Sequence, residues 1–319
     1  MPLMTRRDLL RSSITSAIIY LLAGRSGLAL LASAGRQAAD PVAQMRAQMG
    51  AQPIVSARLS DSLTLLTGPG GNVVVLNGSE GKIVVDSFVQ PAFPAFRQAL
   101  DKMGAAPLRM LIDTHWHIDH TDNNANFRGA GAVILAHVNT KKRMSEAHDL
   151  LGMHFPASPA SALPTQTFLD VRKLQMNGEQ VEAGRIPPAH TDTDIYVHFK
   201  RGNVLHVGDV FFNGMYPFID ASTGGHINGQ IAGATLALKL ADNATKIVPG
   251  HGPLGDKPAL TAYRDMLVTV RDRVKKLKAS GRSLADVVAA KPTAEFDAAW
   301  GKGMMQPNDF VGIVYSTVK

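Results

Sequence analysis

Apolar and polar positions alternate in a way that predicts two successive rounds of strands and helices after about residue 53. Strands are expected where short runs rich in Val, Ile, Leu and Thr lie between turns that contain Gly, Pro or Asn. In the first round these runs are residues 54–59, 63–67, 72–76, 82–86, 108–112 and 132–136. Apolar residues at helical spacing predict a helix over 91–103, which ends at Gly104. A polar helix is expected from 137 to about 150, followed by an irregular loop over 151–166.

The second round repeats this order with a larger share of helix. Its strands are expected at residues 171–176, 181–186, 195–199, 204–207 and 246–248, with hairpins around Asn177-Gly178 and Arg201-Gly202-Asn203. Helices are expected at residues 227–240, 258–278, 283–290 and 309–317. Strands followed by helices, twice, predict the α/β class, with two mostly antiparallel sheets, each covered by helices on one face, in a four-layer αββα sandwich.

The amino-acid composition bounds the size of the domain and excludes several kinds of functional site. The 319 residues, 45% of them hydrophobic, are enough for one large domain or two fused halves. The chain has no cysteine, which excludes disulfides, thiolate metal ligands and cysteine nucleophiles. The formal net charge is +7, and one basic cluster lies at 271–278 on an expected helix. We interpret that cluster as a solvated helix face and expect no nucleic-acid partner.

The first 34 residues contain the parts of an export signal. Arg6-Arg7 precedes a moderately apolar run, 14–31, and Ala32-Ser33-Ala34 follows it. This order resembles a twin-arginine signal peptide, which implies passage through the twin-arginine export machinery to the bacterial periplasm and cleavage after Ala34. Arg25 interrupts the run and argues against a transmembrane helix. An uncleaved amphipathic helix is the alternative, and residues 35–52 are expected to form a flexible leader.

One short stretch, His115-x-His117-x-Asp119-His120, holds three of the eleven histidines. Two histidines at i and i+2 in extended chain point the same way, so both can reach one ion. Imidazole nitrogen and carboxylate oxygen are ligands that zinc prefers, and Asp119 and His120 are placed for a second ion. The alternative is an Asp-capped turn beside surface histidines. We favour metal binding because imidazole is costly to bury without a partner.

Further candidate ligands follow directly after expected strands. They are Asp86, His190, Asp209 and His251. Loops at strand ends, carried on a rigid sheet, are where functional side chains gather. Asp113 is a candidate for a different role, as a carboxylate that accepts an imidazole N–H from a ligand, with a loop-capping Asp as the alternative.

The series formed by Asp86, the HxHxDH motif, His190, Asp209 and His251, in this order and spacing, resembles the metallo-β-lactamase superfamily over about residues 53–255. The resemblance implies an αββα domain at 53–319, with a C-terminal helical part from about 257, and a cleft that holds two Zn2+ ions per chain. It assigns one zinc to His115, His117 and His190, and the other to Asp119, His120 and His251. Asp209 resembles the bridging carboxylate of the thioesterase-like members, and Asp86 the aspartate that orients the metal loop.

The same resemblance implies an exported hydrolase in which a metal-bridging hydroxide opens an amide or ester bond of a small molecule. Asp119 would orient the hydroxide and shuttle a proton. β-Lactam hydrolysis, and with it antibiotic resistance, is the best single expectation. The alternatives are a lactonase or a glyoxalase II-like thioesterase and, less favoured, an iron-dependent persulfide dioxygenase.

Two departures from the β-lactamase pattern bear on the substrate. Neither Lys nor Ser follows Asp209 within residues 210–214, and the turn at 68–71 is short and lacks an apolar side chain. Phe212, Tyr216 and His226 are candidate residues of the substrate pocket, with ordinary core packing as the alternative for the two aromatic ones. The oligomeric state stays open.

Overall fold

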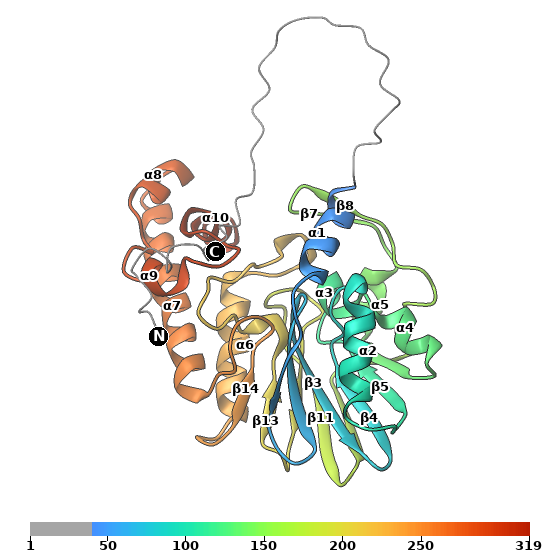
Figure 1. The fold of residues 1–319 in the computed structure, drawn as a ribbon. Coiled ribbons are helices and arrows are strands. Elements are labelled where there is room, and N and C mark those ends of the chain that lie inside the picture. Colours follow the sequence, from blue (N-terminus) through green and yellow to red (C-terminus); the bar gives the residue numbers. More distant parts are fainter. Residues whose placement is uncertain (1–39) are drawn as a thin grey trace, which may run out of the picture. The chain divides into compact units, whose positions relative to one another are not determined.

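The computed structural model describes residues 40–319, whose arrangement is shown in Figure 1. The export signal predicted for residues 1–34 lies outside the described residues, as does the beginning of the predicted leader. Within residues 40–319, no helix combines the length and the apolar composition that crossing a membrane requires.

The first sheet is mixed, with antiparallel pairs in its first half and parallel pairs in its second. Its seven strands, in spatial order, are β1 (Val55–Arg58), β2 (Leu63–Gly68), β3 (Gly71–Gly78), β4 (Gly81–Val85), β5 (Leu108–Ile112), β6 (Val133–His137) and β9 (Gln166–Phe168). The expectation of a mostly antiparallel sheet is wrong here, since β4, β5, β6 and β9 are parallel. Helices connect these four strands, and a helical crossover returns the chain in the same direction.

The second sheet is mainly antiparallel. Its strands, in spatial order, are β10 (Val171–Met176), β11 (Glu179–Arg185), β12 (Ile195–Phe199), β13 (Val204–His206) and β14 (Lys246–Val248). The β13–β14 pair is parallel, because the helix α6 (Ile227–Leu240) connects its two strands. A separate hairpin joins β7 (His148–Leu150) to β8 (Met153–Phe155), where the end of a helix and an irregular loop were expected.

Helices flank the sheets on both outer sides (Figure 1). Those that precede β10 in the chain are α1 (Pro41–Gly50), α2 (Phe93–Asp101), α3 (Ile118–Thr121), α4 (Asn124–Gly129) and α5 (Val138–Met144). Those that follow it are α6, α7 (Lys257–Ala279), α8 (Leu284–Ala289), α9 (Asp297–Trp300) and α10 (Pro307–Thr317). Short 3-10 turns are η2 (Gln90–Ala92), η3 (Gly208–Val210) and η4 (Ala221–Thr223).

Three buried apolar layers confirm the four-layer αββα arrangement. Side chains of β3 alternate between two of these layers: Val73 and Val75 pack with Phe96 of α2, whereas Val74 and Leu76 pack toward the second sheet. The third layer lies between the second sheet and the helices α6, α7 and α10. The two sheets therefore pack face to face, which brings the loops at their strand ends together.

Residues 41–50 were expected to belong to a flexible leader, and that expectation is wrong. They form α1, which Asp40 caps by accepting the N–H of Val42 at 2.9 Å. Arg46 makes a bidentate ion pair with Asp122, in which Nε donates to Oδ2 at 2.9 Å and Nη2 donates to Oδ1 at 2.8 Å. Met49 packs against the apolar layer under α2. The ion pair attaches α1 to Asp122, which directly follows the segment of the HxHxDH motif and α3.

Candidate metal centre

Loops at one edge of the two sheets carry the predicted metal ligands. Asp86 follows β4 and the motif at 115–120 follows β5, and these two strands are parallel. His190 follows β11, Asp209 lies in η3 after β13, and His251 follows β14. These three strands also run in one direction. Strands that run in the same direction end at the same edge, so residues far apart in sequence meet there.

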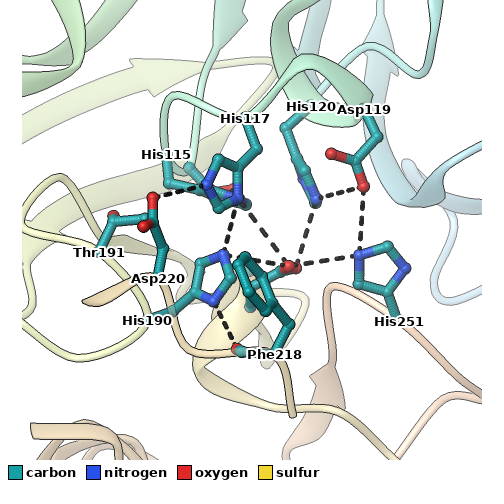
Figure 2. A network of polar contacts seen from close by, with 12 residues as sticks. His115, His117, Asp119, His120, His190, Thr191, Phe218, Asp220 and His251 are labelled. Atoms are coloured by element: carbon teal, nitrogen blue, oxygen red, sulfur yellow. Dashed lines mark hydrogen bonds and ion pairs between the residues drawn. The ribbon is translucent and has the colours of Figure 1, made fainter. Parts of the chain in front are cut away.

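Three imidazoles and one carboxylate form the first group (Figure 2). The Nδ1 of His117 lies 3.2 Å from the Nε2 of His115 and 2.9 Å from the Nε2 of His190. The Oδ2 of Asp209 is 3.4 Å from His190 Nε2 and 3.8 Å from His115 Nε2. All four residues are buried.

Asp119, His120 and His251 form the second group. The Oδ2 of Asp119 lies 3.4 Å from His120 Nε2 and 3.3 Å from His251 Nε2. Asp209 faces this group as well, with Oδ1 3.3 Å from His120 Nε2 and Oδ2 3.3 Å from His251 Nε2. One carboxylate therefore lies between two clusters of nitrogen and oxygen donors.

Contacts behind the first group determine which ring nitrogens carry protons. The Nδ1 of His190 faces the carbonyl oxygen of Phe218 at 2.8 Å, and the Nε2 of His117 faces the carboxylate of Asp220 at 3.2 Å. Both partners only accept hydrogen bonds, so these nitrogens donate and the opposite nitrogens keep lone pairs. Two lone pairs consequently face each other across the 2.9 Å between His117 and His190.

Asp86, to which the family resemblance assigns the orienting of the metal loop, contacts the surroundings of the other two imidazoles. It accepts the N–H and the hydroxyl of Thr114, both at 2.8 Å, and the Nδ1–H of His120 at 2.7 Å. Because the Thr114 hydroxyl donates to Asp86, its oxygen is left to accept from His115 Nδ1 at 3.1 Å. His115 and His120 therefore also turn lone pairs inward.

This donor set fits metal ions. Tetrahedral zinc with ligands at about 2.0–2.1 Å separates neighbouring ligand atoms by about 3.3–3.4 Å, and the separations here are 2.9–3.8 Å. His120 Nε2 and Asp209 Oδ1 are buried without a hydrogen-bond partner among the described residues. Lone pairs that converge at these distances are stable around a cation and repel one another without one.

The contacts of Asp220 and Phe218 with the ligand imidazoles were not predictable from the sequence. Asp220 lies 103 residues after His117 and follows none of the expected strands. A backbone carbonyl such as that of Phe218 has no residue signature at all. Neither contact had a signal in the sequence that could have revealed it.

Asp113 does not contact an imidazole, and that expectation is wrong. Its Oδ2 accepts the side-chain N–H of Asn124 at 2.8 Å. Its Oδ1 is buried and has no hydrogen-bond partner within residues 40–319. Burial raises the pKa of Asp113 well above its ordinary value. Asp113 is therefore a buried carboxyl group that contacts Asn124 and does not hold a ligand in place.

A family model described as the metallo-beta-lactamase superfamily matches residues 66–251, which is more than half of the chain. The match includes both ligand groups and Asp86. The chain belongs to the metallo-beta-lactamase superfamily. It is accordingly a metal-dependent enzyme of the hydrolase type.

Solved structures of other proteins share this fold. DIM-1 metallo-beta-lactamase is 19% identical, covers 68% of this chain and 98% of its own, and has a TM-score of 0.57. A metallo-beta-lactamase from Pontibacter korlensis is 16% identical over 67% of this chain and 98% of its own, with a TM-score of 0.56. The sec-alkylsulfatase Pisa1 from Pseudomonas sp. is 13% identical over 85% of this chain and 51% of its own, with a TM-score of 0.63. At these identities the likeness shows the fold alone.

In sequence, the chain is similar to the alpha subunit of 2,4-dinitroanisole O-demethylase from Nocardioides sp. (strain JS1661). The two are 26% identical over 144 residues. The matched stretch is 44% of this chain and 41% of that protein, so the chain spans less than half of the relative's length.

Charge is divided unevenly between the two groups of this superfamily site. In the first group, burial lowers the pKa of His190 to about 4, so its imidazole is neutral at neutral pH. In the second group, burial by itself would lower the pKa of His251, but Asp209 and Asp119 raise it to about 10. Burial would raise the pKa values of both carboxylates, but His120 and His251 hold the pKa of Asp119, and His251 and His120 together with the first-group histidines hold that of Asp209, well below the ordinary value. A metal ion that enters the second group must displace protons.

A cleft of about 680 Å³ opens over the metal groups, and His117, Asp119, Asp209 and His251 lie in its lining. The predicted pocket residue Phe212 lines it as well, and its ring stacks on His251 with 5.1 Å between centroids. This places an aromatic face directly beside the second group.

The two other predicted pocket residues differ from each other. Tyr216 is part of the cleft lining, but its ring stacks on Phe310 and its hydroxyl donates to Asp297 at 2.8 Å, so the hydroxyl is not free for substrate. His226 does not line the cleft, and the prediction for it is wrong. Its Nδ1 accepts the N–H of Gly229 at 2.9 Å and caps the start of α6.

Proposed function

We propose that this protein is a two-zinc hydrolase that cleaves an ester, lactone or amide bond of a small molecule. The observation that carries the proposal is the position of Asp209, whose oxygens lie 3.3–3.4 Å from imidazole nitrogens of both groups. A carboxylate shared by two clusters of inward-facing donors suits two cations a short distance apart. The first group would hold one zinc and the second group the other.

Bound zinc supplies hydroxide near neutral pH and polarises a carbonyl oxygen. The chain's own residues position the reactants and move the proton. Asp119 lines the cleft with a side chain that is 16% exposed. Its carboxylate is placed to orient the attacking water, accept its proton and pass that proton to the leaving group. Asp86 and Asp220 keep His120 and His117 turned toward the centre.

Zinc is proposed as the metal because the donors are imidazoles and carboxylates at separations that suit a tetrahedral ion. The same kinds of donor also bind Fe(II), which is the basis of the alternative dioxygenase hypothesis. Metal analysis distinguishes the two, because stoichiometric iron in the purified protein would favour the dioxygenase.

A second candidate reaction is hydrolysis of an electron-poor aryl methyl ether. The observation that favours it is the sequence similarity to the alpha subunit of 2,4-dinitroanisole O-demethylase. In this reaction the oxygen of water bonds to the ring carbon that carries the methoxy group. The bond between that carbon and the methoxy oxygen breaks, and a phenol and methanol are formed, with no oxidant required.

The proposal is tested by metal analysis and a substrate panel on the purified protein, with and without a chelator. The panel contains an aryl ester, a γ-lactone, the β-lactam nitrocefin, a thioester and 2,4-dinitroanisole. We expect about two zinc ions per chain and hydrolysis of at least one substrate that stops on chelation and returns with zinc. No chelator-sensitive hydrolysis anywhere in the panel would overturn the proposal.

Two histidine variants form a matched pair for the same assay. His117→Ala removes a ligand of the first group and should lower the zinc content by about one ion and the activity by about 100-fold or more. His226 lies outside the cleft and caps α6, and asparagine can also act as a helix cap, so His226→Asn should retain the wild-type zinc content and activity. Equal losses in the two variants would contradict the ligand assignment.

We also propose export to the periplasm by the twin-arginine machinery, on the basis of Arg6-Arg7 and the apolar run that follows. Replacing both arginines by lysine should keep the full-length protein in the cytoplasmic fraction. An unchanged distribution between cell fractions would contradict export by this route.

A further inference from the structure

The cleft over the metal groups has a wall rich in methionine. Met45 and Met49 come from α1, Met153 from β8, Met215 from the loop after η3, and Met304 from the segment before α10. These five residues lie in four separate parts of the chain and meet around one opening. Methionine is unbranched and polarisable, so such a wall adapts to hydrophobic groups of different shapes.

Away from the metal groups, the described wall holds no cation that a substrate anion could use. Among the described residues that line the cleft, none is Lys or Arg, and the carboxylates are those of Asp119 and Asp209 in the metal groups. Arg46 lies between two of the lining methionines in sequence, but its guanidinium is committed to Asp122 at 2.9 and 2.8 Å. A negative group on the part of the substrate that lies against this wall, away from the metal groups, would therefore lose its water without gaining a charged side chain as a partner.

Two uncharged polar side chains of the lining, those of Asn72 and Thr67, are also committed within the protein, whereas Gln52 in the same lining is exposed. Asn72 donates its amide to the carbonyl oxygens of Pro249 and Gly252, at 3.0 and 2.9 Å. Thr67 donates its hydroxyl to the Asn72 side chain at 2.7 Å. These groups hold the turn between β2 and β3 against the loop that carries His251, and they are not free to hold a polar substrate.

We infer that the site takes an uncharged substrate with a hydrophobic body, such as an alkyl or aryl ester, a lactone with an apolar side chain, or a nitroaryl methyl ether. This inference rests on the proposed two-zinc function and narrows its substrate class. A cleft of about 680 Å³ is large enough for such a body. Leu151 and Met304, which are 53% and 61% exposed, continue the apolar lining outward. β-Lactam antibiotics carry a carboxylate, so their turnover should be weak.

A pair of esters with the same leaving group and chain length tests this inference. The neutral ester is p-nitrophenyl hexanoate, and the anionic one is mono-p-nitrophenyl adipate, whose chain ends in a carboxylate. We expect kcat/KM to be about 10- to 100-fold higher for the neutral ester, with most of the difference in KM. If the panel shows turnover of aryl ethers alone, 2,6-dinitroanisole and 4-methoxy-3,5-dinitrobenzoate form the equivalent pair.

A cation placed in the wall should reverse part of this preference. Met153→Lys should reduce the ratio of the two kcat/KM values by about tenfold, mainly through faster turnover of the anionic ester. Met153→Leu is the matched control and should keep the wild-type ratio. Met45→Lys supplies the cation from α1, so the test does not depend on one variant being folded.

The outcomes separate the inference from the proposed function. Equal kcat/KM for the neutral and anionic members of the pair would overturn the inference and leave the two-zinc hydrolase in place. Unchanged ratios in two folded lysine variants would also overturn it. Absence of metal-dependent turnover across the whole panel would overturn the proposed function itself.

Discussion

Replacing Asp220 by alanine should weaken one of the two proposed metal positions and spare the other. Asp220 is 1% exposed, and its Oδ2 accepts hydrogen bonds from His117 at 3.2 Å and from the hydroxyl of Thr223 at 2.5 Å. The contact keeps the His117 proton on Nε2 and the lone pair on Nδ1, where it converges with the Nε2 of His190. In Asp220→Ala the imidazole is free to rotate or to change tautomer.

The size of the effect follows from the type of contact that is lost. A hydrogen bond to a charged group contributes about 1.5–3 kcal/mol, and about 1.4 kcal/mol corresponds to a factor of ten. We therefore expect zinc affinity at the first group to fall by about 10- to 100-fold, with kcat/KM falling in parallel when zinc is limiting. The second group has no contact with Asp220 and should keep its affinity.

Competition for zinc with a chromophoric chelator measures the two affinities separately. Ser222→Ala is the matched control, because it removes a 2.5 Å hydrogen bond to Asp220 Oδ1 and leaves the contact with His117 in place. Excess zinc should restore the activity of the Asp220 variant. Two wild-type affinities in Asp220→Ala, or an equal loss in the Ser222 control, would refute the role of this carboxylate.

Other predictions concern the turn over the metal loop, α1 and pH. Gly70→Ala would place a Cβ 2.7 Å from that of Asp119 and should lower activity by about tenfold or more, whereas Gly104→Ala, at nearly the same φ with nothing within 4 Å, should not. Arg46→Ala removes the ion pair of α1 and should lower the melting temperature by about 2–4 °C, measured by calorimetry. Burial, aided by a nearby lysine, lowers the pKa of His198 to about 4. The His198 imidazole therefore stays neutral in the folded protein while it becomes protonated in the unfolded chain, so the free energy of unfolding should fall as pH drops from about 6.5 toward 4. His198→Gln should reduce this pH dependence, measured by urea titrations at several pH values.

Strands and ligand loops were predictable from the sequence because their signals are local. The helix expected at 227–240 has the bounds of α6, and the strand expected at 72–76 lies inside β3. His115, His117, Asp119 and His120 share one motif, so their association did not depend on how distant segments pack. The short strands β7 and β8 were missed because three residues carry no readable period.

Contacts between distant segments were decided by the tertiary structure. The order of α1 depends on an ion pair that spans 76 residues, and the orientation of His117 depends on a carboxylate 103 residues away. Asp113 and His226 are residue types that are common in active sites, yet in the folded protein Asp113 accepts a hydrogen bond from Asn124 and His226 caps the start of α6. The sequence by itself determined the ligand types and the strands that carry them, because both are set by neighbours along the chain. The face-to-face packing of the two sheets decided which side chains support those ligands and which apolar residues wall the cleft.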